Sequence, residues 1–286
     1  MCDTCGCNIT PGNEHLIVND GKLSKTSSGG EAVEVLQGVL HENDHQAMHN
    51  RQHFDQHQLL AINLMSSPGS GKTALLEATI DALGDEFNIG VIEGDLETEN
   101  DADRIRKKGV PACQISTGSA CHLDAHMVHD ALHQLTLEDL DILFIENVGN
   151  LVCPASFDLG HHRNITLLSV TEGDDKPAKY PVIFRAADLM LLTKTDLLPY
   201  LEEFKPERAE QYLRELSNPA EMISLSAKSG EGLERWLNWL RHTLQHYRRH
   251  LASGATLTPA LQPDGVALHQ HTHSHDHTHS HDHHHS

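Results

Sequence analysis

The chain has 286 residues and a formal charge of −20 at pH 7, from 41 acidic and 21 basic residues. This length allows one large α/β domain with extensions or two small domains, and the charge argues against binding to nucleic acid or anionic membranes. No apolar run approaches the roughly 18 residues of a membrane helix, and the first residues lack the basic and apolar regions of a signal peptide. We therefore expect a cytoplasmic protein. Its 25 histidines point to metal coordination.

The N-terminal tip carries cysteines in a C-x-x-C-x-C arrangement, at Cys2, Cys5 and Cys7. Thiolates this close together can bind one ion, and the N-terminal amine offers a further donor. A set of sulfur and nitrogen donors suits square-planar Ni²⁺ or tetrahedral Zn²⁺. Residues 8–30 are rich in Gly, Ser and Asn without periodicity, which predicts a flexible linker.

A helical pattern follows over residues 31–57, with apolar residues at mixed three- and four-residue spacings. Histidine recurs at every fourth position of this stretch, at His41, His45, His49, His53 and His57. Residues four apart share one face of a helix, so neighbouring pairs offer bidentate sites for borderline metals. The alternative interpretation is a solvated polar face that binds no metal.

Between residues 59 and 250, apolar strand-like runs alternate with helical stretches. We expect strands at residues 59–65, 89–93, 112–115, 142–146, 165–170, 189–193 and 222–225. We expect helices near residues 73–84, 99–108, 123–135, 206–217 and 231–248. Such alternation predicts βαβ units, and therefore an α/β fold with a mostly parallel sheet flanked by helices.

The first of these strands runs into a glycine-rich turn, Ser66-Ser67-Pro68-Gly69-Ser70-Gly71-Lys72-Thr73, and a helix follows. Its glycines let backbone N–H groups turn toward a phosphate at the helix N-terminus. Lys72 would reach the β- and γ-phosphates, and the Thr73 hydroxyl would bind Mg²⁺. Ser66 stands where the general P-loop pattern has its first glycine. The expected nucleotide contacts are Gly69, Ser70, Gly71, Lys72 and Thr73.

Two later strands end in carboxylates. Asp95 follows the second strand, near the expected position of an attacking water, so we expect Lys72 and Asp95 to carry catalysis. Glu146 ends the fourth strand and could hold Mg²⁺ through a water, and the Gly149 N–H could sense a γ-phosphate. The expected Mg²⁺ ligands are Thr73, Asp95 and Glu146. Either acid could instead cap a helix or lie in a solvated loop.

Two motifs indicate a guanine nucleotide. The sequence Leu191-Leu192-Thr193-Lys194-Thr195-Asp196 resembles the N-K-x-D motif, whose Asp accepts two hydrogen bonds that guanine supplies and adenine does not. Thr193 stands where that motif has Asn. Ser226-Ala227-Lys228 resembles the S-A-K motif that supports the same base. Together they favour GTP over ATP, with contacts from Thr193, Lys194, Asp196, Ser226, Ala227 and Lys228.

The remaining cysteines lie inside the predicted domain. Cys121-His122 opens a helix after a strand, and Cys153 follows Gly149 by four residues, which brings it beside the nucleotide site. A rearrangement that depends on the γ-phosphate would therefore move Cys153. Cytosolic cysteines are more often metal ligands or buried apolar residues than disulfides, and Cys113, within a strand, fits the buried class.

The C-terminal stretch loses periodicity after residue 250, and histidines alternate with Ser, Thr and Asp over residues 269–286. Such a composition cannot bury a core, so we predict a disordered tail at 251–286 that captures or stores nickel through many weak imidazole sites. An affinity tag is the alternative, although a tag is usually an unbroken histidine run.

Together these motifs resemble the hydrogenase nickel-incorporation GTPases, the HypB family of metallochaperones in the SIMIBI class. The resemblance covers the cysteine-rich tip and nearly all of residues 59–240, including Glu146-Asn147-Val148-Gly149-Asn150-Leu151-Val152-Cys153-Pro154. It implies slow hydrolysis of GTP to GDP, a homodimer favoured by GTP, and delivery of Ni²⁺ to a [NiFe]-hydrogenase precursor alongside accessory nickel-insertion proteins. By position, Cys2, Cys5 and Cys7 resemble the tight nickel site of some members. The other three metal-site candidates resemble the weaker Ni²⁺ or Zn²⁺ site of the family's GTPase domain; they are Cys121, His122 and Cys153.

The chain accordingly divides into an N-terminal metal-binding extension at 1–58, a P-loop GTPase domain at 59–250 and the tail at 251–286. A nickel or zinc buffer with a vestigial nucleotide site is one alternative, disfavoured by the intact Lys72 and Asp196. A urease-type nickel GTPase is another, but Ala155 stands where its Cys-Pro-His triplet has histidine. A small-molecule kinase would need a substrate lid and no guanine motif.

Overall fold

The computed structural model describes residues 30–95, 100–118 and 120–260, with side chains from residue 40 onward. The predicted linker, the histidine-rich stretch at 269–286 and the tip with Cys2, Cys5 and Cys7 lie outside the described residues. Within the described ranges, no helix is both long enough and apolar enough to cross a membrane.

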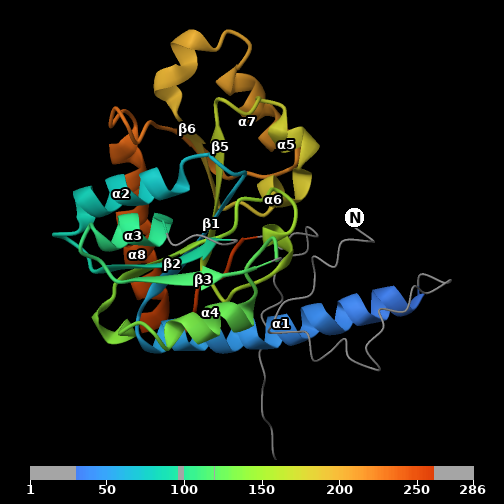
Figure 1. Ribbon diagram of the computed structural model, residues 1–286, viewed down its shortest axis with the longest axis vertical. Helices are drawn as coiled ribbons and strands as arrows, with labels where there is room; N and C mark the ends of the chain where they lie inside the picture. Colours follow the sequence, from blue (N-terminus) through green and yellow to red (C-terminus); the bar gives the residue numbers. More distant parts are fainter. Residues whose placement is uncertain (1–29, 96–99, 119, 261–286) are drawn as a thin grey trace, which may run out of the picture.

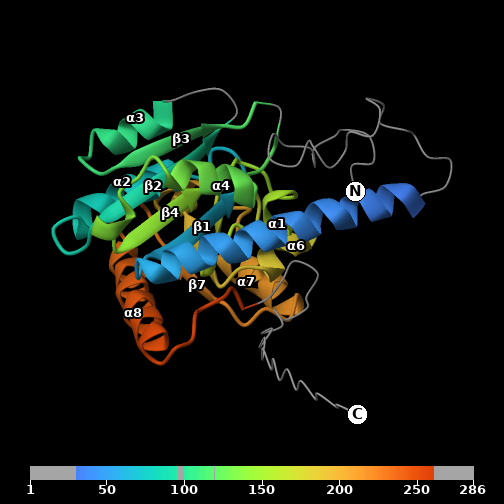
Figure 2. The ribbon, with the colours of Figure 1, turned by 90° about the horizontal axis from the view of Figure 1, so that it is seen from below.

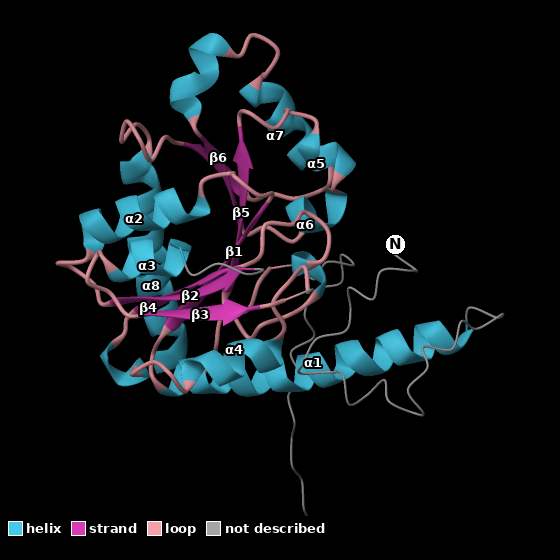
Figure 3. Ribbon diagram, in the orientation of Figure 1, coloured by secondary structure: helices cyan, strands magenta, loops and turns pink. Residues whose placement is uncertain are grey.

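In the described part of the chain, parallel strands form one seven-stranded sheet (Figures 1 and 3). The strand order is β3-β2-β4-β1-β5-β6-β7, so β1 lies at the centre. The strands are β1 (Leu60–Ser66), β2 (Ile89–Asp95), β3 (Ala112–Ser116), β4 (Ile142–Glu146), β5 (Arg163–Ser169), β6 (Leu189–Thr193) and β7 (Glu221–Ser224). Each strand begins and ends close to a predicted one, which confirms the predicted α/β fold with its parallel sheet.

Helices cover both faces of the sheet (Figures 1 and 2). One face packs against α2 (Lys72–Leu83), α3 (Asn100–Arg106) and α8 (Leu233–Ala252). The other packs against α1 (Gly30–Gln56), α4 (Ala125–Leu132), α6 (Pro181–Arg185) and α7 (Pro206–Glu215). The connections also hold α5 (Lys176–Lys179) and the 3₁₀ turns η2 (Leu137–Asp139), η3 (Pro154–Ser156) and η4 (Thr195–Tyr200). The sequence pattern does not predict α5 or α6, because so few residues show no helical period.

On the first face of the sheet, α8 packs against α2. Trp236 on α8 is fully buried, and its indole Nε1 donates a hydrogen bond to the Thr79 Oγ1 of α2 at 2.9 Å. The Trp236 ring also stacks with that of Trp239, with centroids 5.7 Å apart. Because α2 begins at Lys72, this contact fixes the helix that follows the glycine-rich turn.

The second half of α1 is fixed to the sheet domain by buried side chains. Phe54 is fully buried, and Arg51 forms an ion pair with Asp158 at 2.9 Å. Gly160, at a φ of +87°, approaches α1 so closely that a Cβ would lie 2.5 Å from the Ala47 carbonyl oxygen. The predicted N-terminal extension therefore ends in a helix that packs on the domain, while its metal-binding role stays a prediction.

Residues 251–260 correct the predicted start of the disordered tail. Leu257 is buried in the core, and the Thr256 hydroxyl donates a hydrogen bond to the Asp55 carboxylate at 3.0 Å. The sequence pattern misses this segment because one buried leucine and a few polar contacts create no periodicity. The folded region therefore extends at least to residue 260.

Candidate functional site

The turn at residues 66–73, which we call the P-loop, joins β1 to α2 as predicted. Gly69 and Gly71 have φ of +74° and +99°, a conformation that side chains rarely adopt. The Ser66 hydroxyl accepts hydrogen bonds from Lys72 Nζ at 3.1 Å and from the Ser70 hydroxyl at 2.5 Å. The serine that replaces the first glycine of the motif therefore positions the lysine.

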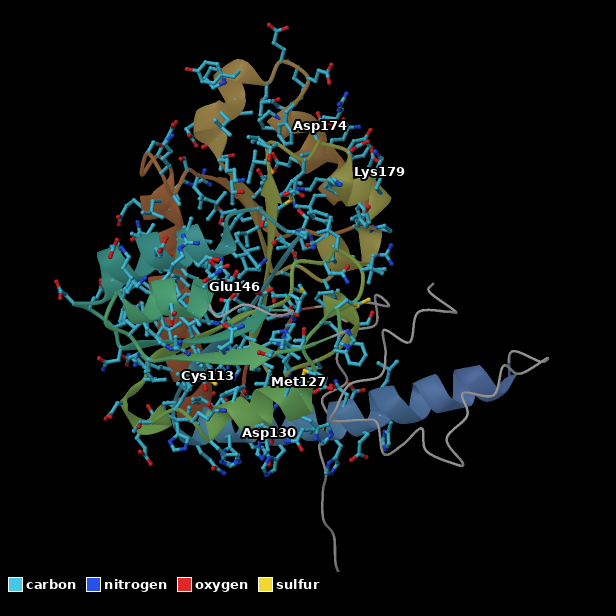
Figure 4. All side chains as sticks on the ribbon, viewed as in Figure 1. Cys113, Met127, Asp130, Glu146, Asp174 and Lys179 are labelled. Carbon is cyan, nitrogen blue, oxygen red and sulfur yellow. The ribbon has the colours of Figure 1, made fainter. Side chains whose placement is uncertain are left out.

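The carboxyl of Glu146 lies beside the P-loop, near the middle of the molecule (Figure 4). Its Oε1 accepts a hydrogen bond from the Thr73 hydroxyl at 3.1 Å and lies 3.8 Å from Lys72 Nζ. Glu93 on β2 pairs in register with Glu146 on β4, and both side chains are buried. Burial, and then the charge of Glu146, raise the pKa of Glu93 to about 10, so Glu93 is protonated at neutral pH.

The carboxyl pair fits a divalent cation once Glu93 releases its proton, which a cation beside Glu146 would favour. Among the described side chains, none donates a hydrogen bond to the buried Oε2 of Glu93 or of Glu146. With the Thr73 hydroxyl, these oxygens form the hard donor set that Mg²⁺ prefers. Glu93 cannot be identified from the sequence, because a single acid in an apolar strand has no visible partner until the strand register is known.

Asp95 is the last residue of β2, two positions beyond Glu93. Its backbone carbonyl accepts a hydrogen bond from the Thr117 N–H at 2.9 Å. The parallel sheet therefore brings Asp95 to the same edge as the P-loop, since both follow the carboxyl ends of strands. Residues 96–99 lie outside the described part, and the catalytic and Mg²⁺-binding roles of Asp95 stay predictions.

The loop after β4 touches the P-loop. A Cβ on Gly149 would lie 2.8 Å from the Cα of Pro68, so only glycine fits at this contact. In the same loop, the Asn147 Oδ1 accepts a hydrogen bond from the Leu123 N–H at 3.1 Å, and its Nδ2 donates one to the Asn63 Oδ1 at 3.2 Å. One buried side chain therefore ties this loop to β1 and to the segment before α4.

The first guanine motif also contacts the P-loop. The Thr193 hydroxyl donates a hydrogen bond to the Ser70 carbonyl at 2.7 Å, and Lys194 Nζ donates one to the Gly69 carbonyl at 2.6 Å. Thr193 is buried. The threonine that departs from the usual asparagine therefore holds the P-loop backbone.

The two guanine motifs meet beyond β6 and β7. The Ser226 hydroxyl donates a hydrogen bond to the Asp196 Oδ1 at 2.7 Å. Ala227 and Lys228 continue the same turn, half-buried and exposed respectively. The structure thus brings the predicted base-reading residues together, and their contact with guanine stays a prediction.

Cys121, His122 and Cys153 lie together, and we call them the thiol site. One donor atom from each of these residues lies within 4.8 Å of the other two. The described cysteines form no disulfide. The Asn150 Nδ2 donates a hydrogen bond to the Cys121 carbonyl at 3.2 Å, which ties the loop before Cys153 to Cys121. Cys113 is buried in the core, as expected.

The imidazole of His122 is held as a neutral group. Burial lowers the pKa of His122 to about 4, and its ring stacks on that of Phe157 with centroids 4.0 Å apart. Its Nδ1 lies 3.8 Å from the Cys121 sulfur, and within the described chain its Nε2 has no hydrogen-bond partner. A neutral imidazole beside two thiols is a donor set typical of Ni²⁺ and Zn²⁺ sites.

A carboxylate that is absent from the predicted site also contacts the P-loop. Glu172 accepts a hydrogen bond from the Ser67 hydroxyl and another from the Ser169 N–H, the latter at 3.1 Å. Glu172 follows β5, which neighbours β1 in the sheet. The acidic sequence directly after this buried strand is the signal that could have identified it.

Residues 60–224 match the family described as "CobW/HypB/UreG, nucleotide-binding domain". The hydrogenase maturation factor HypB of Escherichia coli (strain K12) is 56% identical over 208 residues, which cover 73% of this chain and 71% of that protein. The crystal structure of HypB from Helicobacter pylori in complex with nickel is 44% identical, with a TM-score of 0.69 over 72% of this chain and 96% of that one. The crystal structure of HypB from Archaeoglobus fulgidus is 41% identical, with a TM-score of 0.67 over 72% of this chain and 100% of that one.

Proposed function

This chain belongs to the CobW/HypB/UreG nucleotide-binding family, among the HypB hydrogenase maturation factors, and we propose that it is a GTP-hydrolysing nickel metallochaperone. In this function it binds Ni²⁺ and delivers it to a [NiFe]-hydrogenase precursor. The observation that supports the proposal most is the physical link between the P-loop and the thiol site. Gly149 packs on Pro68, and Asn147 in the same loop bonds to Leu123, the residue after His122.

In this proposal GTP is the substrate. Backbone N–H groups of the P-loop and the Lys72 ammonium hold its phosphates. Thr73 and Glu146, with Asp95 at the same edge of the sheet, would hold Mg²⁺, which would supply charge neutralisation for the phosphates. Asp95 accepts the hydrogen bond that orients the attacking water. Turnover is slow, because no motif of the chain supplies a glutamine or arginine finger in cis.

Guanine is read by Asp196, whose carboxylate accepts hydrogen bonds from the base. Ser226 donates to the same carboxylate and holds its orientation. Ala227 and Lys228 complete the loop against the base. This assignment is supported by the contact of both motifs with each other and by the contact of Thr193 with the P-loop.

Nickel is the cargo of this protein. The thiol site provides three ligands and leaves a coordination position open for transfer to an acceptor. Zn²⁺ competes for the same donors, because the ligand preferences of the two ions overlap. Cys2, Cys5 and Cys7 form a tighter site at the tip, and the histidine-rich tail stores nickel.

The proposed partners follow from this delivery role. They are a second copy of the chain, favoured by GTP, together with accessory nickel-insertion proteins and the hydrogenase precursor. The strongly acidic composition disfavours nucleic acid and anionic membranes as partners. We infer that the protein acts in the cytoplasm.

The decisive experiment measures GTP hydrolysis and nickel transfer to the hydrogenase precursor by the full chain. Lys72→Ala removes the phosphate contact and should abolish both turnover and GTP-dependent transfer. Lys108→Ala, which removes an exposed lysine paired with Asp81, is the matched control and should change neither. Equal hydrolysis by parent and Lys72→Ala would refute the enzymatic role, and transfer that ignores GTP would refute the delivery role.

A further inference from the structure

A cluster of histidines lies between α1 and α4, outside the thiol site. We call it the histidine cluster, and its members are His49, His53, His57, His129 and His133. His49, His53 and His57 belong to the four-residue repeat at residues 41–57, and the fold packs them against His129 and His133, about 75 residues further along the chain. The two helices lie side by side in both ribbon views (Figures 1 and 2).

The packing of α1 on α4 fixes the positions of these histidines. The Ala125 N–H at the start of α4 donates a hydrogen bond to the Asn43 Oδ1 at 2.9 Å. The Asn50 Nδ2 donates one to the Ala125 carbonyl at 2.7 Å. Both asparagines are buried, so the register of the two helices is set by hydrogen bonds as well as by apolar packing. His129 on α4 therefore stands opposite His49 and His53 on α1.

The rings lie close together, although their nitrogens do not converge within 4.8 Å of one another as the donor atoms of the thiol site do. Ring centroids are 5.0 Å apart for His49 and His53, 5.3 Å for His49 and His129, and 6.0 Å for His53 and His129. Three imidazoles at metal–nitrogen distances of about 2.0–2.1 Å in a tetrahedron place their centroids about 5 Å apart. Binding of one ion by all three rings therefore requires their side chains, which lie at the surface, to rotate until three nitrogens converge.

Further histidines flank the group formed by His49, His53 and His129. His133 lies 4.8 Å from His129 and His57 lies 6.5 Å from His53, measured between ring centroids. A cavity of about 340 Å³ is lined by four of these imidazoles and by the carboxylate-bearing Glu138. This cavity borders His53 and His129 but not His49, so it offers further donors, His57 and His133, at the edge of the seam.

The chemical state of the rings suits a metal. The His129 Nδ1 is buried and has no hydrogen-bond partner among the described residues. Burial, followed by the neighbouring imidazoles, lowers the pKa of both His53 and His129, which keeps their nitrogen lone pairs available. A solvated polar face would not leave a ring nitrogen enclosed and unpaired.

We propose that His49, His53 and His129 form a second, interhelical site for a borderline divalent transition ion such as Ni²⁺ or Zn²⁺. His57 and His133 are additional ligands at its edges. Imidazole donors select such ions over Mg²⁺ and Ca²⁺, which prefer oxygen. The site needs neither nucleotide nor the thiol site, so it stands independently of the proposed GTPase function.

Hydrogen exchange of the full chain, followed by mass spectrometry of its peptides, tests this site without interference from the histidine-rich tail. The probe is NiSO₄ in nucleotide-free buffer, and the readout is exchange in peptides from residues 40–56 and 125–132. An ion that bridges α1 and α4 slows exchange in both helices, whereas MgSO₄ at the same concentration does not. His129→Ala should abolish the nickel effect in α1 as well as in α4, or raise its midpoint about tenfold or more.

Matched variants separate this site from the other metal ligands. His41→Ala combined with His45→Ala removes two exposed imidazoles from the same helix and should leave the nickel effect intact. Cys153→Ala removes a ligand of the thiol site and should also leave the effect on α1 intact. His49→Ala, at an exposed position, should abolish protection in α4 and serves if His129→Ala disturbs that helix.

The proposal is overturned if nickel leaves exchange in both helices unchanged, or if protection of α1 survives in both His129→Ala and His49→Ala. It is also overturned if Cys153→Ala abolishes protection of α1. Failure of GTP hydrolysis or of nickel delivery would leave these expectations as they are.

Discussion

The side-chain oxygen of Asn147 accepts a hydrogen bond from the backbone N–H of Leu123 at 3.1 Å. Asn147 lies two residues before Gly149, which contacts the P-loop, and Leu123 directly follows His122 of the thiol site. A movement of the loop after β4 would therefore reach the thiol site through this buried hydrogen bond as well as through the bond of Asn150 to the Cys121 carbonyl.

We predict that nickel affinity of the thiol site differs several-fold between the GDP state and a non-hydrolysable GTP analogue, from a coupling of about 1–3 kcal/mol. Asn147→Ala should remove most of this difference, because it removes the connecting hydrogen bond. It should also lower the free energy of unfolding by about 1–3 kcal/mol, since buried partners lose their bonds. The measurement is a nickel titration of a variant that lacks residues 1–7 and 261–286 and carries His129→Ala, so that the proposed histidine site does not contribute.

Asn238→Ala, at an exposed asparagine on α8, is the control for this coupling and should leave both nickel affinities unchanged. Equal nickel affinity in the two nucleotide states of the parent would show that this hydrogen bond transmits nothing between the sites.

Two variants should distinguish residues that select guanine from residues that bind any nucleotide. Asp196→Ala should weaken GTP binding by about 1.5–3 kcal/mol, the range for hydrogen bonds to a charged group, and leave ATP binding nearly unchanged. Thr193→Val keeps the shape of the side chain but loses the bond to the Ser70 carbonyl. It should weaken GTP and ATP alike by about 1 kcal/mol, as measured by calorimetric titration. An unchanged preference for GTP in Asp196→Ala would exclude Asp196 as the residue that reads guanine.

Stability should fall in mild acid because of His161. Burial lowers the pKa of His161 to about 4, against an ordinary value of 6.5. Between pH 6.5 and about 4 the unfolded chain binds a proton that the folded His161 does not. The free energy of unfolding therefore has its full value above pH 6.5 and decreases as the pH falls from there through about 4. His161 alone should contribute up to about 3 kcal/mol of this loss. Urea unfolding at pH 7 and pH 4.5 should show a smaller loss for His161→Gln than for the parent.

His133→Gln, at an exposed position, controls for the removal of an imidazole from the surface. If His161→Gln loses as much stability in acid as the parent, another group accounts for the acid sensitivity.

The ion pair between Arg51 and Asp158 should hold α1 on the domain. Arg51→Ala leaves a buried carboxylate without its partner, which costs about 3–5 kcal/mol. The double variant with Asp158→Ala should cost less than the sum of the two single variants, because it leaves no unpaired charge. The pair formed by Arg235 and Glu221 has a similar length of 2.7 Å but is exposed, and Arg235→Ala should cost less than about 1 kcal/mol. Additive losses for Arg51 and Asp158 in urea unfolding would contradict this prediction.

The strands and the P-loop could be predicted because their signals are local. A run such as residues 142–145 is apolar throughout, and the turn at residues 66–73 combines glycines, lysine and threonine in a fixed order. The residues of the thiol site could be identified from a family resemblance. Their closeness in space, however, depends on the loop that carries Asn147 and Asn150. No periodicity encodes such a loop.

Pairings across the sheet and between helices could not be predicted. Glu93 becomes significant only when the β2–β4 register places it beside Glu146. His129 is one more surface histidine on its own helix until α1 packs against α4. Residues 251–260 are ordered by isolated contacts such as that of Thr256 with Asp55. These features depend on long-range geometry, which a pattern along the chain does not contain.

The placement of the tryptophans has a spectroscopic consequence. The chain has two, and both lie on α8, where Trp236 bonds to α2 on the face of the sheet opposite α1 and α4. The emission of a buried indole depends on its immediate surroundings, so intrinsic fluorescence follows the contact between α2 and α8. Because α2 begins at Lys72, nucleotide binding that shifts this helix changes the emission. Metal binding in the seam between α1 and α4 acts on the other face of the sheet and should change this emission less than nucleotide binding does, although Tyr247 on α8 also bonds to Asp55 on α1.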